Sequence, residues 1–130
     1  MKQVIKIISL TLLIGLTLSC QKKNVGMNEE FTLKFNKTAI VKADGKKIEI
    51  KFNKLVEESR CQPGVQCVWA GQVAVQIQLD GSSESIIGFH SEYPSSILYK
   101  EHTIRLLEVN YDSPSHFGEE SHYSLRLKVE

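Results

Sequence analysis

The sequence predicts an all-β fold, a small antiparallel β-sandwich of about seven strands that follows a cleaved N-terminal segment. Apolar and polar residues alternate along most of the chain beyond residue 30, which gives a strand one buried and one exposed face. The chain has only four alanines, which disfavours a helical body. Turn sequences such as Asp44-Gly45 separate the alternating runs. A small barrel is the alternative arrangement for such strands.

The expected strands follow from where the alternation is strongest. It is clearest in residues 31–35, 48–52, 73–79 and 123–129. Weaker strands are expected at residues 39–42, 85–89 and 103–109. The segment 103–109 has apolar residues on both faces, so we expect it near the centre of a sheet or at an edge that packs on both sides.

The first 19 residues are typical of an export signal. Lys2 and Lys6 come before an uncharged run over residues 7–18, which is shorter than the roughly 20 residues that span a membrane. The sequence Leu18-Ser19-Cys20 then resembles the lipobox of bacterial lipoproteins, although the leucine usually stands where Thr17 is. This resemblance implies cleavage before Cys20 and attachment of lipid to its thiol. We therefore expect a membrane anchor at Cys20 in the bacterial cell envelope, in the outer membrane where the host has two membranes.

The composition beyond the signal bounds the domain and its partners. Residues 20–30 are polar and aperiodic, which predicts a flexible tether, and residues 31–130 form the predicted sandwich domain. The formal net charge of the chain is +1, so nothing indicates nucleic acid as a partner. The partners we expect are the membrane and an envelope protein or ligand of unknown identity, and no cofactor is expected.

Two of the three cysteines lie between strong strands. Pro63-Gly64, the preferred centre of a type II turn, lies between Cys61 and Cys67 and would fold them together. In an exported protein such a pair is expected to be oxidised, and closing a seven-residue loop stabilises by about 2.4 kcal/mol in the chain-entropy model. A zinc site or a redox pair fits the spacing less well, because both favour shorter intervals.

Trp69 directly follows this loop. We expect its ring to pack against the disulfide and close one end of the sandwich, as buried tryptophans often do. The alternative is an exposed binding loop in which Arg60, Pro63, Gly64 and Trp69 contact a partner.

A short motif surrounds the same loop. Glu58-Ser59-Arg60-Cys61, then Val65, Cys67 and Trp69-Ala70-Gly71, resemble a family of small exported bacterial proteins, mostly lipoproteins. That family carries (D/E)-S-R-C followed by V-x-C-x-W-A-G, and Gln62 stands where it usually has proline. The resemblance implies a small β-sandwich and no established activity.

The leading functional hypothesis is a lipid-anchored, non-catalytic accessory or binding module. The sequence contains neither a nucleophile-elbow motif nor a phosphate-binding glycine loop, so we expect no enzyme. A second hypothesis is a protease inhibitor that presents Arg60 and the Pro63-Gly64 turn of the Cys61–Cys67 loop. A third is a periplasmic metal-binding protein that holds Zn²⁺ or Cu²⁺ through histidines, the candidates being His90, His102, His116 and His122.

Overall fold

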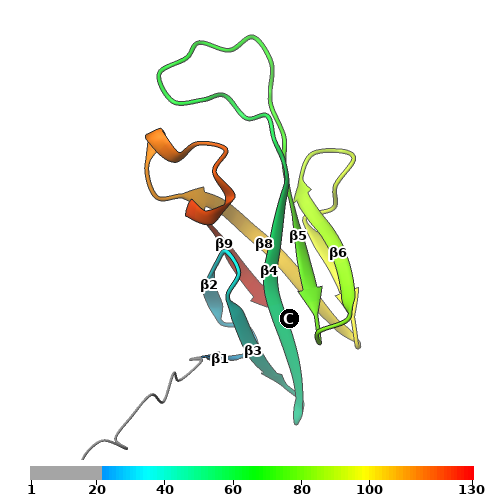
Figure 1. Ribbon diagram of the computed structural model, residues 1–130. Coiled ribbons are helices and arrows are strands. Elements are labelled where there is room, and N and C mark those ends of the chain that lie inside the picture. The colour runs from blue at the N-terminus through cyan, green and yellow to red at the C-terminus, as the bar shows by residue number, and fades with distance from the viewer. Residues whose placement is uncertain (1–21) are drawn as a thin grey trace, which may run out of the picture.

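The computed structural model describes residues 22–130, so the predicted signal peptide and Cys20 lie outside the described residues. This part of the chain forms two sheets (Figure 1). One has the order β1-β3-β4-β5-β6 and the other β2-β9-β8-β7. Neither sheet closes on itself into a barrel. The predicted all-β sandwich is therefore confirmed, and the alternative of a small barrel is not. The strands are β1 (Lys23–Gly26), β2 (Glu30–Lys34), β3 (Thr38–Ala43), β4 (Lys46–Glu58), β5 (Val73–Leu79), β6 (Ser83–Phe89), β7 (Ser96–Tyr99), β8 (His102–Tyr111) and β9 (Tyr123–Val129).

Every strand expected from the alternation is present, and the structure adds two more, β1 and β7. The prediction of a flexible tether is wrong for residues 23–26. These residues form β1, which pairs in parallel with β3, and Val25 lies opposite Val41. Main-chain hydrogen bonds and one buried valine hold this strand, so no alternation marked it in the sequence. Within residues 22–130, no helix is long and apolar enough to span a membrane.

The core lies between the sheets and is formed by the alternating residues. Ile48, Ile50 and Phe52 on β4 are fully buried, as are Leu125 and Leu127 on β9. Burial of such side chains is the main favourable contribution to folding, at about 25 cal/mol per Å² of apolar surface.

The alternation on β4 changes near its end because two register shifts interrupt its pairing with β5, between Phe52 and Lys54 and between Leu55 and Glu57. The Leu55 amide there donates instead to the Glu120 carboxylate, at 3.1 Å. Bulges of this kind bend and twist a strand, and here they lie just before the long β4–β5 loop.

Asp80, which directly follows β5, connects the two sheets. The carboxyl end of β5 lies at the lower end of the sandwich in Figure 1. Asp80 Oδ1 accepts from the Glu49 amide at 2.9 Å, and its Oδ2 accepts from the Tyr99 hydroxyl and the Lys100 ammonium, both at 2.7 Å. Burial opposes ionisation of this carboxyl, but the three hydrogen bonds outweigh it and hold the pKa of Asp80 below its usual value.

We predict that Asp80→Asn lowers the free energy of unfolding by about 1–3 kcal/mol at neutral pH, because hydrogen bonds to a charged acceptor are lost. Asparagine tolerates the left-handed conformation of this residue, whose φ is 49°, without added strain. The loss should shrink as pH falls through the lowered pKa of Asp80, because the wild type then loses the same charge. Urea denaturation at pH 7 and pH 3 measures it, with exposed Glu92→Gln as the control. An equal change in the free energy of unfolding for the two substitutions at pH 7 would contradict the role of Asp80 in joining the sheets.

Candidate functional site

The clamped loop, residues 59–72 between β4 and β5, projects beyond the sandwich (Figure 1). The predicted Cys61–Cys67 disulfide is present, with 5.8 Å between the two Cα atoms. The Val65 amide donates to the Gln62 carbonyl at 3.1 Å, and Gly64 has a φ of 80°. Both features match the type II turn predicted at Pro63-Gly64. The loop is therefore closed by a covalent bond and a turn within a few residues.

The neck of the clamped loop is where Ser59 meets Gln72. The Ser59 amide donates to the Gln72 carbonyl at 2.8 Å, and the Gln72 amide donates to the Ser59 hydroxyl at 3.0 Å. Gly71 must be glycine for steric reasons, since a Cβ there would lie 1.9 Å from the Ser59 carbonyl oxygen. The Trp69 indole nitrogen donates to the same oxygen at 3.2 Å. The motif residues Ser59, Trp69 and Gly71 thus build the neck.

The Glu58 cluster, made of Glu58, Arg60 and Tyr123, fixes the base of the neck. The Glu58 side chain is 4% exposed. Its Oε1 accepts from Arg60 Nε at 2.9 Å, and its Oε2 accepts from Arg60 Nη2 at 2.5 Å and from the Tyr123 hydroxyl at 2.9 Å. Arg60 also donates to the Val109 carbonyl at 2.8 Å, so β4 is joined to β8 and β9 of the other sheet. The hydrogen bond to Glu58 raises the pKa of Arg60.

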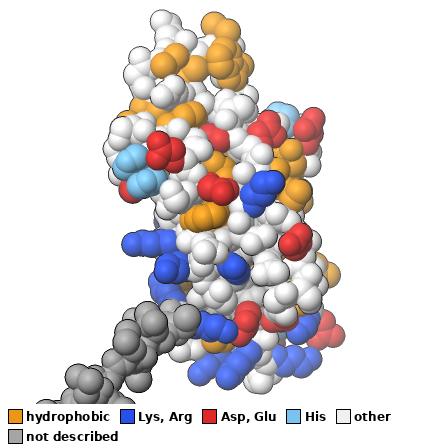
Figure 2. Space-filling model, viewed as in Figure 1, with side chains coloured by type: hydrophobic (Ala, Val, Ile, Leu, Met, Phe, Trp, Pro, Cys, Tyr) orange, Lys and Arg blue, Asp and Glu red, His pale blue; other side chains and the backbone are white. Residues whose placement is uncertain are grey.

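The structure corrects the expected position of Trp69, whose side chain is not in the sandwich. Trp69 is 60% exposed and Val68 is 96% exposed. The disulfide and the neck hold the clamped loop away from the core, so its apolar side chains cannot reach the space between the sheets. With the exposed Val65 they form what we call the apolar tip, and Figure 2 shows hydrophobic side chains gathered over this end of the molecule.

Sequence reasoning missed Val65 and Val68 as surface residues. Their signal was present, because two valines stand in a segment without the period of a strand and within two residues of a cysteine. Of the residues predicted for a binding loop, Pro63, Gly64 and Trp69 lie on the exposed part of the loop, and Arg60 lies half-buried at its base.

The four candidate histidines separate into three places. His90 is exposed after β6, and His102 is buried at the start of β8, with its Nε2 3.5 Å from the Asp44 carboxylate. His116 and His122 meet at Asp112 in the β8–β9 loop. Sequence reasoning missed Asp112, which directly follows β8.

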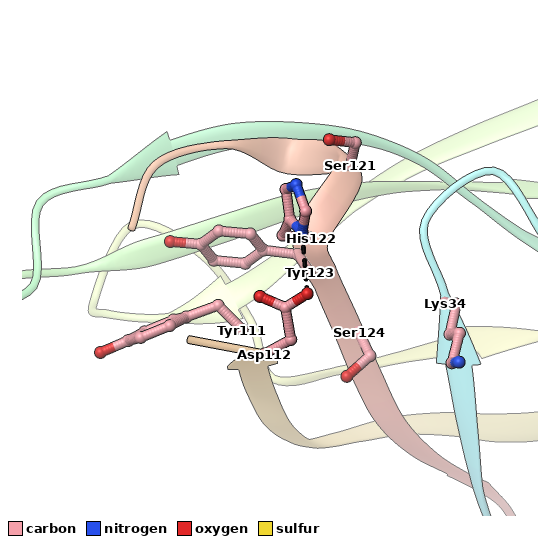
Figure 3. A pocket seen from close by; sticks show the side chains of 7 residues that line it. All are labelled: Lys34, Tyr111, Asp112, Ser121, His122, Tyr123 and Ser124. Carbon is pink, nitrogen blue, oxygen red and sulfur yellow. Dashed lines mark hydrogen bonds and ion pairs between the residues drawn. The ribbon is translucent and has the colours of Figure 1, made fainter. Parts of the chain in front are cut away.

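A pocket of about 240 Å³ lies beside that loop (Figure 3). Residues from β2, β8, β9 and the β8–β9 loop line it: Lys34, Tyr111, Asp112, Ser121, His122, Tyr123 and Ser124.

Comparison of the chain with protein-family models, with curated proteins and with solved structures found no match in any of the three.

Tyr123 provides a pH test of the Glu58 cluster. Burial raises the pKa of Tyr123 to about 12, the Gly118 amide opposes this increase and the Glu58 carboxylate adds to it. Because the pKa is higher in the folded protein than the usual 10, this contribution to stability is complete below pH 10 and is lost as pH rises towards 12.

We predict that wild type loses about 1–2 kcal/mol more of its free energy of unfolding between pH 8 and pH 11 than Tyr123→Phe does. Urea denaturation of both proteins at the two pH values measures this difference. The other tyrosines are present in both proteins and cancel. Equal losses in the two proteins would show that the Tyr123 hydroxyl is not held as described.

Proposed function

We propose that this protein is a lipid-anchored, non-catalytic binding module of the bacterial cell envelope that presents its apolar tip to a partner protein. The observation that carries the proposal is the exposure of Val65, Val68 and Trp69 on a loop that is held in one shape. Large exposed apolar side chains rimmed by polar residues are typical of interaction sites. Tryptophan is also enriched among the residues that dominate binding energy.

The construction of the clamped loop supports a binding role. The disulfide, the turn at Pro63-Gly64 and the paired neck restrict the loop before any partner arrives. A preordered loop loses less conformational entropy on association, so more of its contact energy appears as affinity. A purely structural loop would have no need to hold Val68 and Trp69 in water, where their exposure is unfavourable.

The position of the N-terminal strand fits the proposed anchor. β1, the first strand, lies low on the sandwich in Figure 1, whereas the clamped loop projects from the top. A lipid on Cys20, three residues before Lys23, would therefore leave the apolar tip directed away from the membrane. In that orientation the tip meets other envelope proteins rather than the lipid surface.

Protease inhibition receives less support from the geometry. An inhibitor of a trypsin-like enzyme inserts a free basic side chain into a specificity pocket, but the Arg60 guanidinium is held by Glu58 and by the Val109 carbonyl. Releasing it would leave the Glu58 carboxylate buried without its cation, at a cost of several kcal/mol. The tip itself offers apolar rather than basic anchors.

We predict that Val68→Glu removes cross-links between the lipidated protein and its partner on intact cells. A photoreactive residue at Gln66 supplies the cross-linker, and the control is Leu98→Glu on β7, since Leu98 is also exposed, at 77%. A charge at the tip must be desolvated on binding, whereas a charge on β7 leaves the interface unchanged. Loss of a discrete cross-linked band in Val68→Glu alone supports the proposal.

Equal cross-linking by wild type and Val68→Glu, or equal loss in both variants, would contradict a binding role for the tip. Cell fractionation of the same strains tests the anchor separately. Cys20→Ala should move the protein from the membrane to the soluble fraction, because stable attachment needs the acyl chains. Unchanged membrane partitioning of Cys20→Ala would overturn the anchor and leave the tip to be judged by the cross-links.

A further inference from the structure

We propose that Asp112, His116 and His122, which we call the histidine cluster, bind a Zn²⁺ ion. The proposal is independent of the apolar tip, because the cluster lies in the β8–β9 loop and not in the clamped loop. Each residue offers one ligand atom, and these atoms all lie within 4.8 Å of one another. Imidazole nitrogens and carboxylate oxygens are both among the ligand atoms that bind Zn²⁺ in proteins.

The fold places these residues together through the way in which the loop closes. Asp112 follows β8 directly and His122 precedes β9 directly, and the Asp112 amide donates to the His122 carbonyl at 3.1 Å. His116 ends the short 3₁₀ helix η1 (Pro114–His116), where its amide donates to the Ser113 carbonyl at 2.9 Å. The backbone therefore sets all three positions before any ion binds, as a precise site requires.

The side chains converge on one carboxylate. Nδ1 of His116 lies 2.6 Å from Asp112 Oδ1, and Nδ1 of His122 lies 2.7 Å from Oδ2. The two rings stack with centroids 3.6 Å apart, so both present the same nitrogen to the same side. Tetrahedral Zn²⁺ with bonds near 2.0–2.1 Å needs ligand atoms about 3.4 Å apart. Rotation of the Asp112 side chain, which is more than half exposed, supplies the opening of less than about 1 Å that this requires.

Glu119 supplies the outer partner that histidine ligands of metals usually have. Its carboxylate lies 3.6 Å from Nε2 of His122, the nitrogen that does not face Asp112. In zinc sites the second ring nitrogen commonly faces a carboxylate, which fixes the ring and increases its basicity. The Glu119 amide donates to the His116 carbonyl and the His122 amide donates to the Glu119 carbonyl, both at 3.0 Å, which keeps Glu119 in place. Two carboxylates beside two imidazoles also balance the charge of a dication.

The pocket gives the ion access and a free coordination position. Asp112 and His122 line it (Figure 3), and both histidines are about one-third exposed. With three protein ligands, the fourth position is left for water or a small anion from the pocket. Hydrogen bonding to Asp112 without any ion is the competing explanation for the same arrangement, and the experiment separates the two.

The test is calorimetric titration of the full chain with ZnCl₂, in detergent and with the Cys61–Cys67 disulfide oxidised. The chain carries Cys20→Ser, so that no free thiol competes for the ion. We expect one Zn²⁺ per chain. His116→Gln and His122→Gln should each lower the affinity more than about 100-fold, beyond the usual effect of losing an outer partner. The control variant His90→Gln should bind as the parent does.

Two further measurements keep the result interpretable. Thermal unfolding without Zn²⁺ should give similar midpoints for His122→Gln and the parent, which shows that the variant folds. Imidazole ¹⁵N spectra should show coordination through Nδ1 of His116 and His122. Absence of saturable binding, equal weakening by His90→Gln, or unchanged affinity in both cluster variants would overturn the site.

Discussion

The buried carboxylate of Glu58 is the interaction on which both loops at the upper end of the sandwich depend. An ionised carboxylate removed from water costs several kcal/mol unless donors surround it. Arg60 and Tyr123 supply those donors, and they come from the clamped loop and from β9 of the other sheet. Keeping Glu58 satisfied therefore requires the neck of the clamped loop and the end of β9 to stay where they are.

The same cluster extends to the β8–β9 loop. The Tyr123 hydroxyl accepts a hydrogen bond from the Gly118 amide at 2.9 Å, and Gly118 lies between the two histidines of the histidine cluster. Glu120 of that loop accepts from the Leu55 amide on the bulged part of β4. Asp80 joins the sheets in a corresponding way at the lower end, so one carboxylate near each end ties the two layers across the apolar core. Both proposed binding surfaces therefore lie at the end of the sandwich where the Glu58 cluster adds an ion pair and hydrogen bonds to the apolar packing.

Local pattern was enough to predict most of the fold. Alternation located the strands from β2 to β9 except β7, and the Cys61, Pro63-Gly64 and Cys67 spacing predicted the disulfide and its turn. β1 was missed because main-chain pairing and a single buried valine hold it, so it has no apolar period. β7 was missed because Leu98, which is exposed, stands between Ile97 and Tyr99 and hides the alternation of these two core-facing residues. Trp69 was misplaced because its burial depends on the direction in which a long loop leaves the sandwich. The link from Glu58 to Tyr123 spans 65 residues, and the meeting of Asp112 with two histidines depends on two short 3₁₀ turns, so neither has a local signature.

Residue-level amide hydrogen exchange in Glu58→Gln tests the central claim most directly, because this substitution keeps the size of the side chain and removes its charge. If the Glu58 cluster holds both loops, the Ser59 and Gly118 amides should exchange at least about 10-fold faster than in wild type, while amides in the middle of β5 keep their protection. Unchanged exchange at Ser59 and Gly118, or an equal loss of protection along every strand, would contradict the account.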